Sequence, residues 1–274
     1  LVLPVRAAKP RARGLTIVID SGVPARYFQD AIESAAPYID LVKFGWGTSI
    51  ISDQLEQKIA CLQQQNIGYF FGGTLFEKFY SQGKTAAYAA YCRRFGTRFV
   101  EISNGTISLS NDDKARVIAD FARDFTVLSE VGYKNSEASQ HLHPAKWIEF
   151  IQQDLEAGAR KVITEARESG TSGICRPGGE LRYGLIEEIL QSSIDADDLI
   201  FEAPNKTLQT YFIRRLGANV NVANVALNDV IPLETLRLGL RSDTLLAFDD
   251  LLEDLPDGHA GGYESLLKGG SYAR

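Results

Sequence analysis

The feature that most constrains the fold of this chain is a repeated alternation of short apolar runs with longer segments of helical periodicity. Each apolar run is nearly continuous, is rich in β-branched or aromatic residues, and ends in a polar residue and a turn. Such runs are typical of parallel strands that are covered on both faces. We expect eight strands, at residues 15–20, 41–45, 67–72, 99–103, 126–131, 161–165, 199–202 and 220–225.

The segments between these runs predict helices. Several of them begin at a proline or end at a glycine, as helices commonly do. Successive strand ends lie about 29 residues apart on average, which matches the roughly 30 residues of a strand–helix unit. The expected helices cover residues 24–36, 53–64, 84–95, 112–124, 144–157, 185–192, 206–216 and 232–240.

Eight such units in 274 residues, with no break in composition, predict an α/β fold with a single (β/α)8 TIM barrel. We expect the barrel at residues 14–244, an N-terminal arm at 1–13, and a short acidic C-terminal extension at 245–274 with a helix and a glycine-rich tail. The alternative is a doubly wound open sheet. That fold usually carries GxGxxG after its first strand, and this sequence does not.

Charge and composition exclude several function classes. The formal net charge of −6 argues against a general affinity for nucleic acid. No apolar run approaches the roughly 18 residues that suggest a membrane span, and the N-terminus lacks the apolar core of a secretory signal. The three cysteines show neither zinc-ligand spacing nor a disulfide pattern. We therefore expect a cytoplasmic protein that binds neither nucleic acid nor membranes, and a homo-oligomer stays open.

Charged residues recur where the predicted strands end. In a barrel of this kind the active site lies at the carboxyl ends of the strands. Several carboxylates at one mouth cannot all stay ionised without countercharge. Oxygen-only ligands favour Mg²⁺ over zinc, and the surplus of basic residues in the following loops favours small anionic substrates. The strand ends offer Asp20, Lys43, Glu101, Glu130, Glu165 and Glu202, and the loops offer Asn104, Lys134, Arg167, Glu168 and Lys206.

Two further features predict anion binding at this mouth. Glycine-rich turns, such as the one at Gly72 and Gly73, can present backbone N–H groups to a phosphate or carboxylate. Lys206 opens a predicted helix after the seventh strand, where barrels often bind phosphate, and Arg167 and Arg241 would assist it. The alternative is that Lys206 is a surface lysine and that Arg241 pairs with Asp243.

The strand-end phrases resemble a known family, the phosphosulfolactate synthases, which include a related plant branch associated with heat-stress tolerance. The resemblance runs in order from about residue 14 to residue 244. The matching phrases are LVKFGWGTS at 41–49, GGTLFE at 72–77, EISNGTI at 101–107, LSEVG at 128–132, EARESG at 165–170, IFEAPNK at 200–206 and DVIPLETLRLGLRSDT at 229–244.

This resemblance implies a (β/α)8 barrel that joins sulfite to phosphoenolpyruvate with Mg²⁺, giving (2R)-phospho-3-sulfolactate on the route to coenzyme M. It implies that Lys134 is the general acid, by its position beyond strand five. We expect Lys43, Glu130 and Lys134 to be catalytic. We expect Glu101, Glu165 and Glu202 to bind the metal, and Arg167, Lys206, Arg241, Gly72 and Gly73 to bind the substrate.

The sequence departs from the family at two positions. Ser21 stands where the family often has lysine, and Asn104 where it often has aspartate. These changes favour, as an alternative, a barrel that has lost the activity and acts through protein contacts in heat-stress recovery. A third hypothesis is a Schiff-base aldolase that uses Lys43 or Lys134. It is weaker, because such a lysine needs a lowered pKa and few carboxylates around it.

Overall fold

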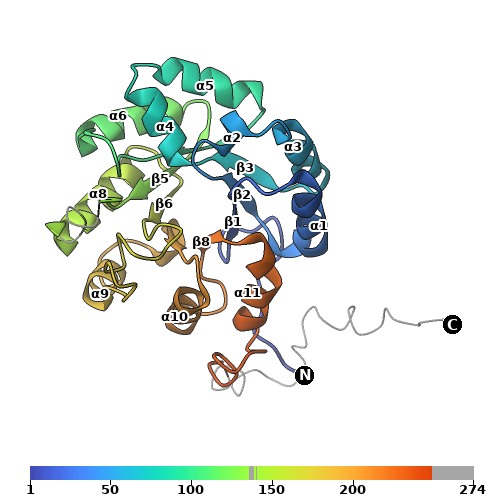
Figure 1. Cartoon of the computed structure of the whole chain (residues 1–274). Helices are drawn as coiled ribbons and strands as arrows, with labels where there is room; N and C mark the ends of the chain where they lie inside the picture. Colours follow the sequence, from blue (N-terminus) through green and yellow to red (C-terminus); the bar gives the residue numbers. More distant parts are fainter. Residues whose placement is uncertain (136–138, 140, 249–274) are drawn as a thin grey trace.

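The computed structural model describes residues 1–135, 139 and 141–248. Strands and helices alternate along it, and the helices form a ring around the central strands (Figure 1). The strands are β1 (Thr16–Asp20), β2 (Leu41–Phe44), β3 (Gly68–Phe71), β4 (Phe99–Ile102), β5 (Thr126–Val131), β6 (Lys161–Thr164), β7 (Leu199–Glu202) and β8 (Val222–Val225).

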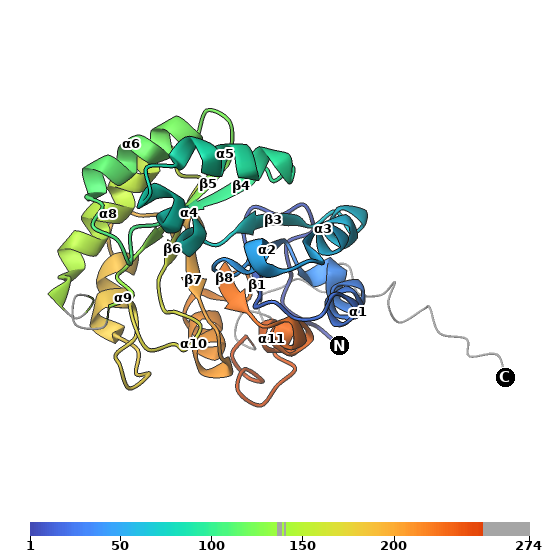
Figure 2. The ribbon, with the colours of Figure 1, turned by 45° about the horizontal axis from the view of Figure 1, so that its top comes forward.

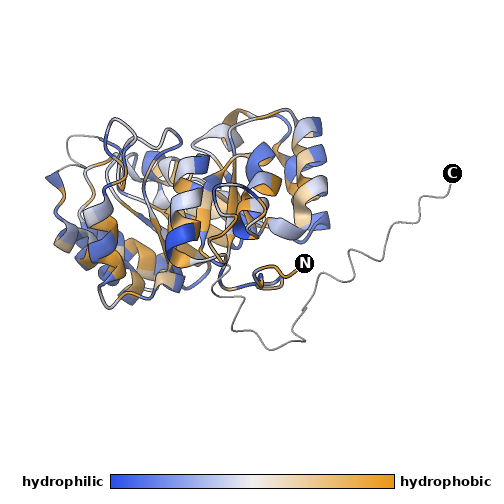
Figure 3. Ribbon diagram, turned by 90° about the horizontal axis from the view of Figure 1, so that it is seen from below, coloured by the Kyte–Doolittle hydropathy of each residue, from blue (hydrophilic) through white to orange (hydrophobic). Residues whose placement is uncertain are grey.

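The helices pack with their apolar faces toward the strands, as the hydropathy colouring of Figure 3 shows. The spacing of buried residues explains this packing: α1, for example, buries Phe28 and Ile32 four residues apart on one face. The helices are α1 (Ala25–Ala35), α2 (Thr48–Ile51), α3 (Leu55–Gln64), α4 (Gly73–Tyr80), α5 (Thr85–Arg94), α6 (Asn111–Phe121), α8 (Pro144–Glu156), α9 (Tyr183–Leu190), α10 (Lys206–Leu216) and α11 (Val230–Arg237).

All paired strands are parallel, in the order β3-β2-β1-β8-β7-β6-β5-β4. The two outer strands of this order, β3 and β4, also lie next to each other around the barrel (Figure 2). Their seam has no paired register in the described residues, but the Thr97 hydroxyl just before β4 donates to the Tyr69 carbonyl oxygen of β3 at 2.5 Å. The barrel is therefore nearly closed, and the predicted (β/α)8 fold is confirmed.

The helix prediction was incomplete at two places. The sequence predicts a glycine-rich turn at Gly72 and Gly73 and no helix at residues 48–51, yet α4 begins at Gly73 and α2 begins at Thr48. Glycine usually interrupts helices, but Gly72 is an extended N-cap residue, and the sequence TLFEKFY after Gly73 favours a helix. The predicted C-terminal helix and tail fall mainly on residues 249–274, which lie outside the described residues.

The N-terminal arm is held against the amino-end face of the barrel. The Arg6 guanidinium donates to Glu234 Oε1 of α11 at 2.8 Å and to the Ala218 carbonyl oxygen at 2.9 Å. Lys9 Nζ donates to the carbonyl oxygens of Ala36 and Ile39, which precede β2. Over the described residues, no helix is long and apolar enough to cross a membrane.

Candidate active site

The barrel interior is built by a two-residue repeat within the strands. A strand side chain and the one two positions later point to the same face. In β2, β5 and β7 an inward apolar residue is therefore followed by an inward charged one: Leu41 by Lys43, Leu128 by Glu130, and Ile200 by Glu202. Phe99 and Glu101 of β4, and Ile163 and Glu165 at the end of β6, repeat the pattern. An apolar layer thus closes the barrel beneath a charged one.

Lys43 is the centre of the charged layer. Its Nζ lies 3.0 Å from Glu101 Oε2, 3.3 Å from Glu202 Oε1 and 3.6 Å from Glu130 Oε2. The side chains of all three glutamates are at most 1% exposed, and that of Lys43 is 8% exposed. Three strand ends that are far apart in the sequence therefore meet around one ammonium group.

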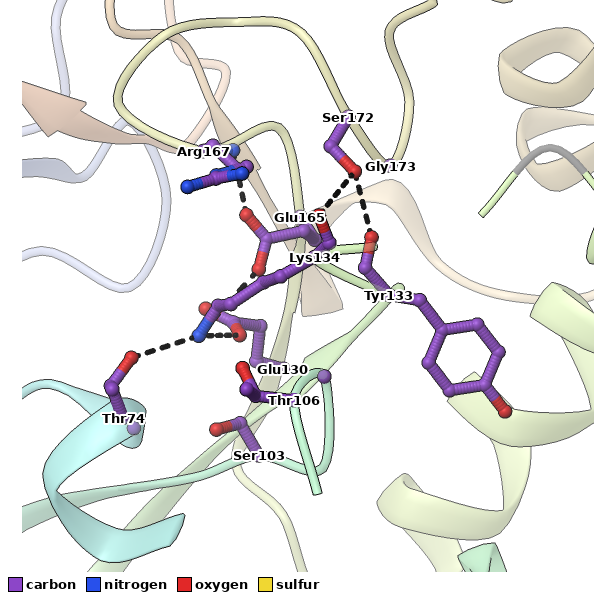
Figure 4. Close-up of polar contacts among 12 residues, drawn as sticks. Thr74, Ser103, Thr106, Glu130, Tyr133, Lys134, Glu165, Arg167, Ser172 and Gly173 are labelled. Atoms are coloured by element: carbon purple, nitrogen blue, oxygen red, sulfur yellow. Dashed lines mark hydrogen bonds and ion pairs between the residues drawn. The ribbon is translucent and has the colours of Figure 1, made fainter. Parts of the chain in front are cut away.

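Lys134 carries the second ammonium group of the site. Its Nζ lies 3.3 Å from Glu130 Oε1, 3.8 Å from Glu165 Oε2 and 3.1 Å from the hydroxyl of Thr74 (Figure 4). The side chain of Lys134 is 22% exposed, whereas both glutamates are buried. Lys134 lines the mouth pocket together with Lys43, Trp46 and Arg167. A ligand that enters the mouth therefore meets Lys134 before it meets the glutamates.

Backbone N–H groups fix the glutamate orientations. The Gly73 N–H, at the start of α4, donates to Glu101 Oε1 at 2.7 Å. The Ala166 and Arg167 N–H groups donate to Glu202 Oε2 at 2.8 and 2.9 Å, and the Arg167 N–H also lies 2.6 Å from Glu165 Oε1. One oxygen of Glu101, of Glu165 and of Glu202 is thereby anchored, and the other faces a lysine. Glu130 has no such anchor, and its two oxygens face Lys43 and Lys134.

Backbone strain is concentrated at the same mouth. Trp46, Arg167 and Asn224 have positive φ angles of 49°, 62° and 57°, a region that residues with side chains rarely adopt. All three line the mouth pocket. Strained conformations persist where the surrounding structure holds them and cluster at functional sites. Their position here supports this mouth as the active site.

Burial and the neighbouring charges drive the glutamate pKa values apart. Burial raises the pKa of Glu101 to about 7, against the lowering effect of Lys43. Burial and the neighbouring Glu130 also raise the pKa of Glu165 well above its usual range. For Glu130, burial is outweighed by Lys134 and Lys43, which lower its pKa to about 2. The raised values show that the two lysines do not balance all four carboxylates.

The mouth presents carboxylate oxygens, the ligand type that Mg²⁺ prefers in proteins. Three buried carboxylate oxygens, Glu101 Oε2, Glu130 Oε1 and Glu165 Oε2, lie beside lysine ammonium groups and have no geometrically good hydrogen bond. The carboxyl groups of Glu130 and Glu165 also lie next to each other. In the part of the chain that the structure describes, no three acidic, histidine or cysteine side chains are grouped so as to hold a metal ion. Glu202 has both oxygens engaged, by Lys43 and by two N–H groups.

Comparison with known proteins decides the family. The model of (2R)-phospho-3-sulfolactate synthase (ComA) matches residues 4–243, which include every strand of the barrel and the whole charged layer. The chain belongs to this family. It is therefore an enzyme, and its active site is expected at the strand ends described above.

Individual relatives agree with this assignment. The phosphosulfolactate synthase of Bacillus subtilis is 55% identical over 89% of this chain and 97% of its own. The plant protein HEAT-STRESS-ASSOCIATED 32 of Arabidopsis thaliana is 23% identical over 85% of this chain and 88% of its own. A solved 3-hexulose-6-phosphate synthase has a TM-score of 0.52 and 14% identity, over 81% of this chain and 98% of its own. That likeness shows the fold alone.

The two lysines of the mouth, Lys43 and Lys134, have raised pKa values, and this argues against the Schiff-base hypothesis. Four glutamates raise the pKa of Lys43 despite its burial, and Glu130 and Glu165 raise that of Lys134. A Schiff-base lysine must be neutral to attack a carbonyl, so it needs a lowered pKa. The electrostatics of this phosphosulfolactate synthase family member therefore oppose an aldolase mechanism.

Two predicted substrate-binding residues lie away from the glutamates. Lys206 Nζ lies 3.1 Å from Asp243 Oδ1, and its side chain is 51% exposed. The side chain of Asn205 caps α10 by accepting from the Leu208 N–H, so Lys206 occupies the first helical position and extends outward. Neither Lys206 nor Arg241 is among the residues that line the mouth pocket. The structure brings Arg167, Gly72 and Gly73 to the mouth and leaves these two outside it.

Ser21 and Asn104, the two positions that depart from the family pattern, have little effect on the structure of the mouth. Ser21 is exposed. The Asn104 amide donates to the Leu109 carbonyl oxygen at 2.9 Å and to Asn111 Oδ1 at 3.3 Å. Asn104 therefore holds the loop between β4 and α6 and contributes no charge to the glutamate cluster.

Sequence reasoning missed three residues that shape the site. Thr74 is a hydrogen-bond partner of Lys134, and the Asn224 side-chain oxygen is buried at the mouth without a hydrogen bond. The buried Glu77 carboxylate accepts from the Ser103 hydroxyl at 2.6 Å and from the Gly105 N–H at 2.9 Å. The sequence predicts no element at residues 75–83, so the helical spacing that points Glu77 toward the barrel is missed.

Gly73→Ala is expected to lower turnover by disturbing Glu101. A Cβ at this position would meet the Ser103 hydroxyl oxygen and come within 2.7 Å of Glu101 Oε1. Overpacking of this kind costs about 1–3 kcal/mol and shifts the neighbours. Steady-state kinetics should show a clear loss, whereas Gly178→Ala, where nothing lies within 4 Å, should retain wild-type rates. Equal rates for both variants would contradict the role of the Gly73 contact.

Proposed function

We propose that this enzyme adds sulfite to phosphoenolpyruvate to form (2R)-phospho-3-sulfolactate, with Mg²⁺ as cofactor. The observation that carries the proposal is the pair of ammonium groups, Lys43 and Lys134, held at one mouth by four buried glutamates. The 55% identity to the Bacillus subtilis phosphosulfolactate synthase supports the choice of reaction. The reactants carry a phosphate, a carboxylate and sulfite, so cationic groups are required at the mouth.

The proposed substrate contacts come from the groups that are accessible at the mouth. Lys134 is partly exposed, and the Arg167 side chain is 42% exposed beside it. Gly72 and Gly73 bring the start of α4 to the same pocket, where the helix dipole favours an anion. Lys43 lies deeper and acts through the glutamates that it balances.

Glu101 and Glu165 are the proposed magnesium ligands. Each has an oxygen that accepts no hydrogen bond, and each has a raised pKa that a nearby cation would relieve. Glu202, the third ligand expected from the sequence, would contribute only by releasing Lys43. The bound ion would stabilise the negative charge that develops on the substrate carboxylate.

The proton step is assigned to Lys134. The sulfur lone pair of sulfite forms the bond to C3 of phosphoenolpyruvate, and the π electrons of the C2–C3 bond move toward C2 and the carboxylate. Lys134 Nζ then gives a proton to C2 and becomes neutral until solvent reprotonates it. Glu130, ionised because its pKa is about 2, keeps Lys134 charged and oriented before the step.

The reaction is tested by incubating the protein with phosphoenolpyruvate, sulfite and Mg²⁺ and following the phosphorus species by ³¹P NMR. We expect loss of the enol phosphate and growth of one alkyl phosphate without release of inorganic phosphate. Omission of sulfite, or addition of a chelator, should stop the reaction. No turnover in the complete mixture would overturn the proposal and favour the alternative of a diverged barrel that acts through protein contacts.

The affinity for Mg²⁺ is expected to rise with pH. A metal ion displaces the proton that Glu101 holds below its pKa of about 7. Below that pKa the affinity should increase about tenfold per pH unit for each displaced proton. Calorimetric titration with MgCl₂ in buffers of different ionisation enthalpy measures both the affinity and the protons released. In Glu101→Gln this proton release should disappear; release that persists unchanged would exclude Glu101 as a ligand.

The cytoplasmic location stays a prediction, and the oligomeric state stays open.

A further inference from the structure

A second pocket lies at the amino-end face of the barrel, opposite the glutamate mouth. Leu41, Gly68, Phe99 and Lys161, which line it, are the first residues of β2, β3, β4 and β6. The residues of the arm at 9–12 form its outer wall. The apolar layer that carries Leu41 and Leu128 separates it from the charged layer above. A ligand in this pocket would therefore have no path to the active site through the barrel interior.

The lining of this amino-end pocket is strongly cationic in a chain whose net charge is −6. Among the described residues, Asp40 is the one carboxylate that lines it, and it is already engaged: Oδ1 pairs with Arg11 Nε at 2.9 Å, and Oδ2 accepts from the Thr16 N–H at 2.8 Å. The cationic side chains that line the pocket are Lys9, Arg11, Arg98, Arg160 and Lys161.

Two of these cations, Lys9 and Lys161, are held in place by uncharged acceptors. Lys9 Nζ donates to the carbonyl oxygens of Ala36 and Ile39, and Lys161 Nζ donates to that of Asp197. Uncharged acceptors leave the positive charge of each ammonium group in the pocket. Burial lowers the pKa of Lys9 against the raising effect of Asp40, and burial together with Arg160 lowers that of Lys161 against the raising effect of the aspartates at 195, 197 and 198.

Arg98 and Arg160 are available to a ligand. Their backbones are fixed on either side of β5, since the Arg98 carbonyl oxygen accepts from the Thr126 N–H and the Arg160 N–H donates to the Val127 carbonyl oxygen. Their side chains are exposed, and among the described residues neither forms a hydrogen bond or an ion pair. Two guanidinium groups thus stand at the rim over an apolar floor of Leu15, Leu41, Phe99 and Leu128.

We propose that the amino-end pocket binds a small organic anion that carries at least two negative charges and an apolar body. The guanidinium pair would hold a phosphate or sulfonate group, for which its planar donors are suited. The floor would cover the apolar part. This site is independent of the proposed reaction, because it uses no residue of the mouth.

The test is a titration with 1-naphthyl phosphate, followed by calorimetry and by the melting temperature of the protein. We expect binding of one molecule and a raised melting temperature, because a ligand that binds only the folded state stabilises it. Inorganic phosphate and 1-naphthol, which each lack one of the two features, should bind at least tenfold more weakly. Equal binding of inorganic phosphate would overturn the role of the apolar floor.

Variants distinguish binding of the ligand in this pocket from binding at the mouth and from an effect of general surface charge. Arg98→Gln/Arg160→Gln should weaken naphthyl phosphate binding at least tenfold, and since neither side chain has a partner, the fold should be preserved. Arg116→Gln/Arg123→Gln removes the same charge from side chains that are 75% and 78% exposed on the surface, and should leave binding unchanged. Lys134→Ala should also leave it unchanged. Loss of binding in Lys134→Ala, or retention in Arg98→Gln/Arg160→Gln, would contradict the proposal.

Discussion

Lys134→Ala is expected to lower kcat by about 10²–10⁴-fold, the usual contribution of a general acid, with KM for phosphoenolpyruvate little changed. Lys134 is the ammonium group that is both partly exposed at the mouth and held between Glu130 and Glu165. In the free protein these carboxylates raise its pKa, which makes it charged but a weak acid. Negative charge that develops at C2 attracts its proton. Initial rates over a range of substrate concentrations measure both constants.

A control variant and a comparison of KM with kcat distinguish a proton donor from a residue that only binds the substrate. Lys78→Ala removes an exposed lysine from α4 and should leave kinetics unchanged, which controls for net charge. A rise in KM with kcat preserved would instead show that Lys134 only binds the anionic substrate. Retained turnover in Lys134→Ala would refute its role in the proton step.

The barrel was predictable because its signal repeats. Eight apolar runs, each buried on two faces, and a regular strand–helix spacing leave few other arrangements. The errors fall on short helices beside glycines, such as α4, where Gly72 serves as an N-cap although glycine usually indicates a turn. The exact strand ends were also missed by a residue, as at Glu165, which follows β6.

The glutamates of the site were predictable by the same logic, since strand ends meet at one mouth. Their electrostatics were not, because the sequence does not show that Lys43 lies within 3.6 Å of three of them. Nor does it show that Asn205 caps α10 and leaves Lys206 beside Asp243. Pairings between distant segments depend on side-chain direction, which only the packed barrel determines.

Lys43→Met is expected to cost about 3–5 kcal/mol of unfolding free energy, the usual effect of removing one partner from a buried ion pair. The loss should grow with pH. A carboxyl whose folded-state pKa is raised adds stability below its unfolded pKa and loses it as pH rises through the folded value. For Glu101 that window runs from its ordinary pKa of 4.5 to about 7, and further without Lys43. Urea unfolding at about pH 5 and about pH 8 measures the difference.

A second substitution tests whether the cost comes from uncompensated glutamates. Glu101→Gln in the Lys43→Met background removes one of the buried charges and should recover part of the stability, mostly at the higher pH. Lys58→Met provides the matched control: Lys58 is also buried and pairs with Asp20 at 2.6 Å, outside the cluster. Its cost should be comparable, but Glu101→Gln should not relieve it. Recovery in both backgrounds would mean that Glu101→Gln stabilises the barrel by itself, and that Lys43 does not serve as its countercharge.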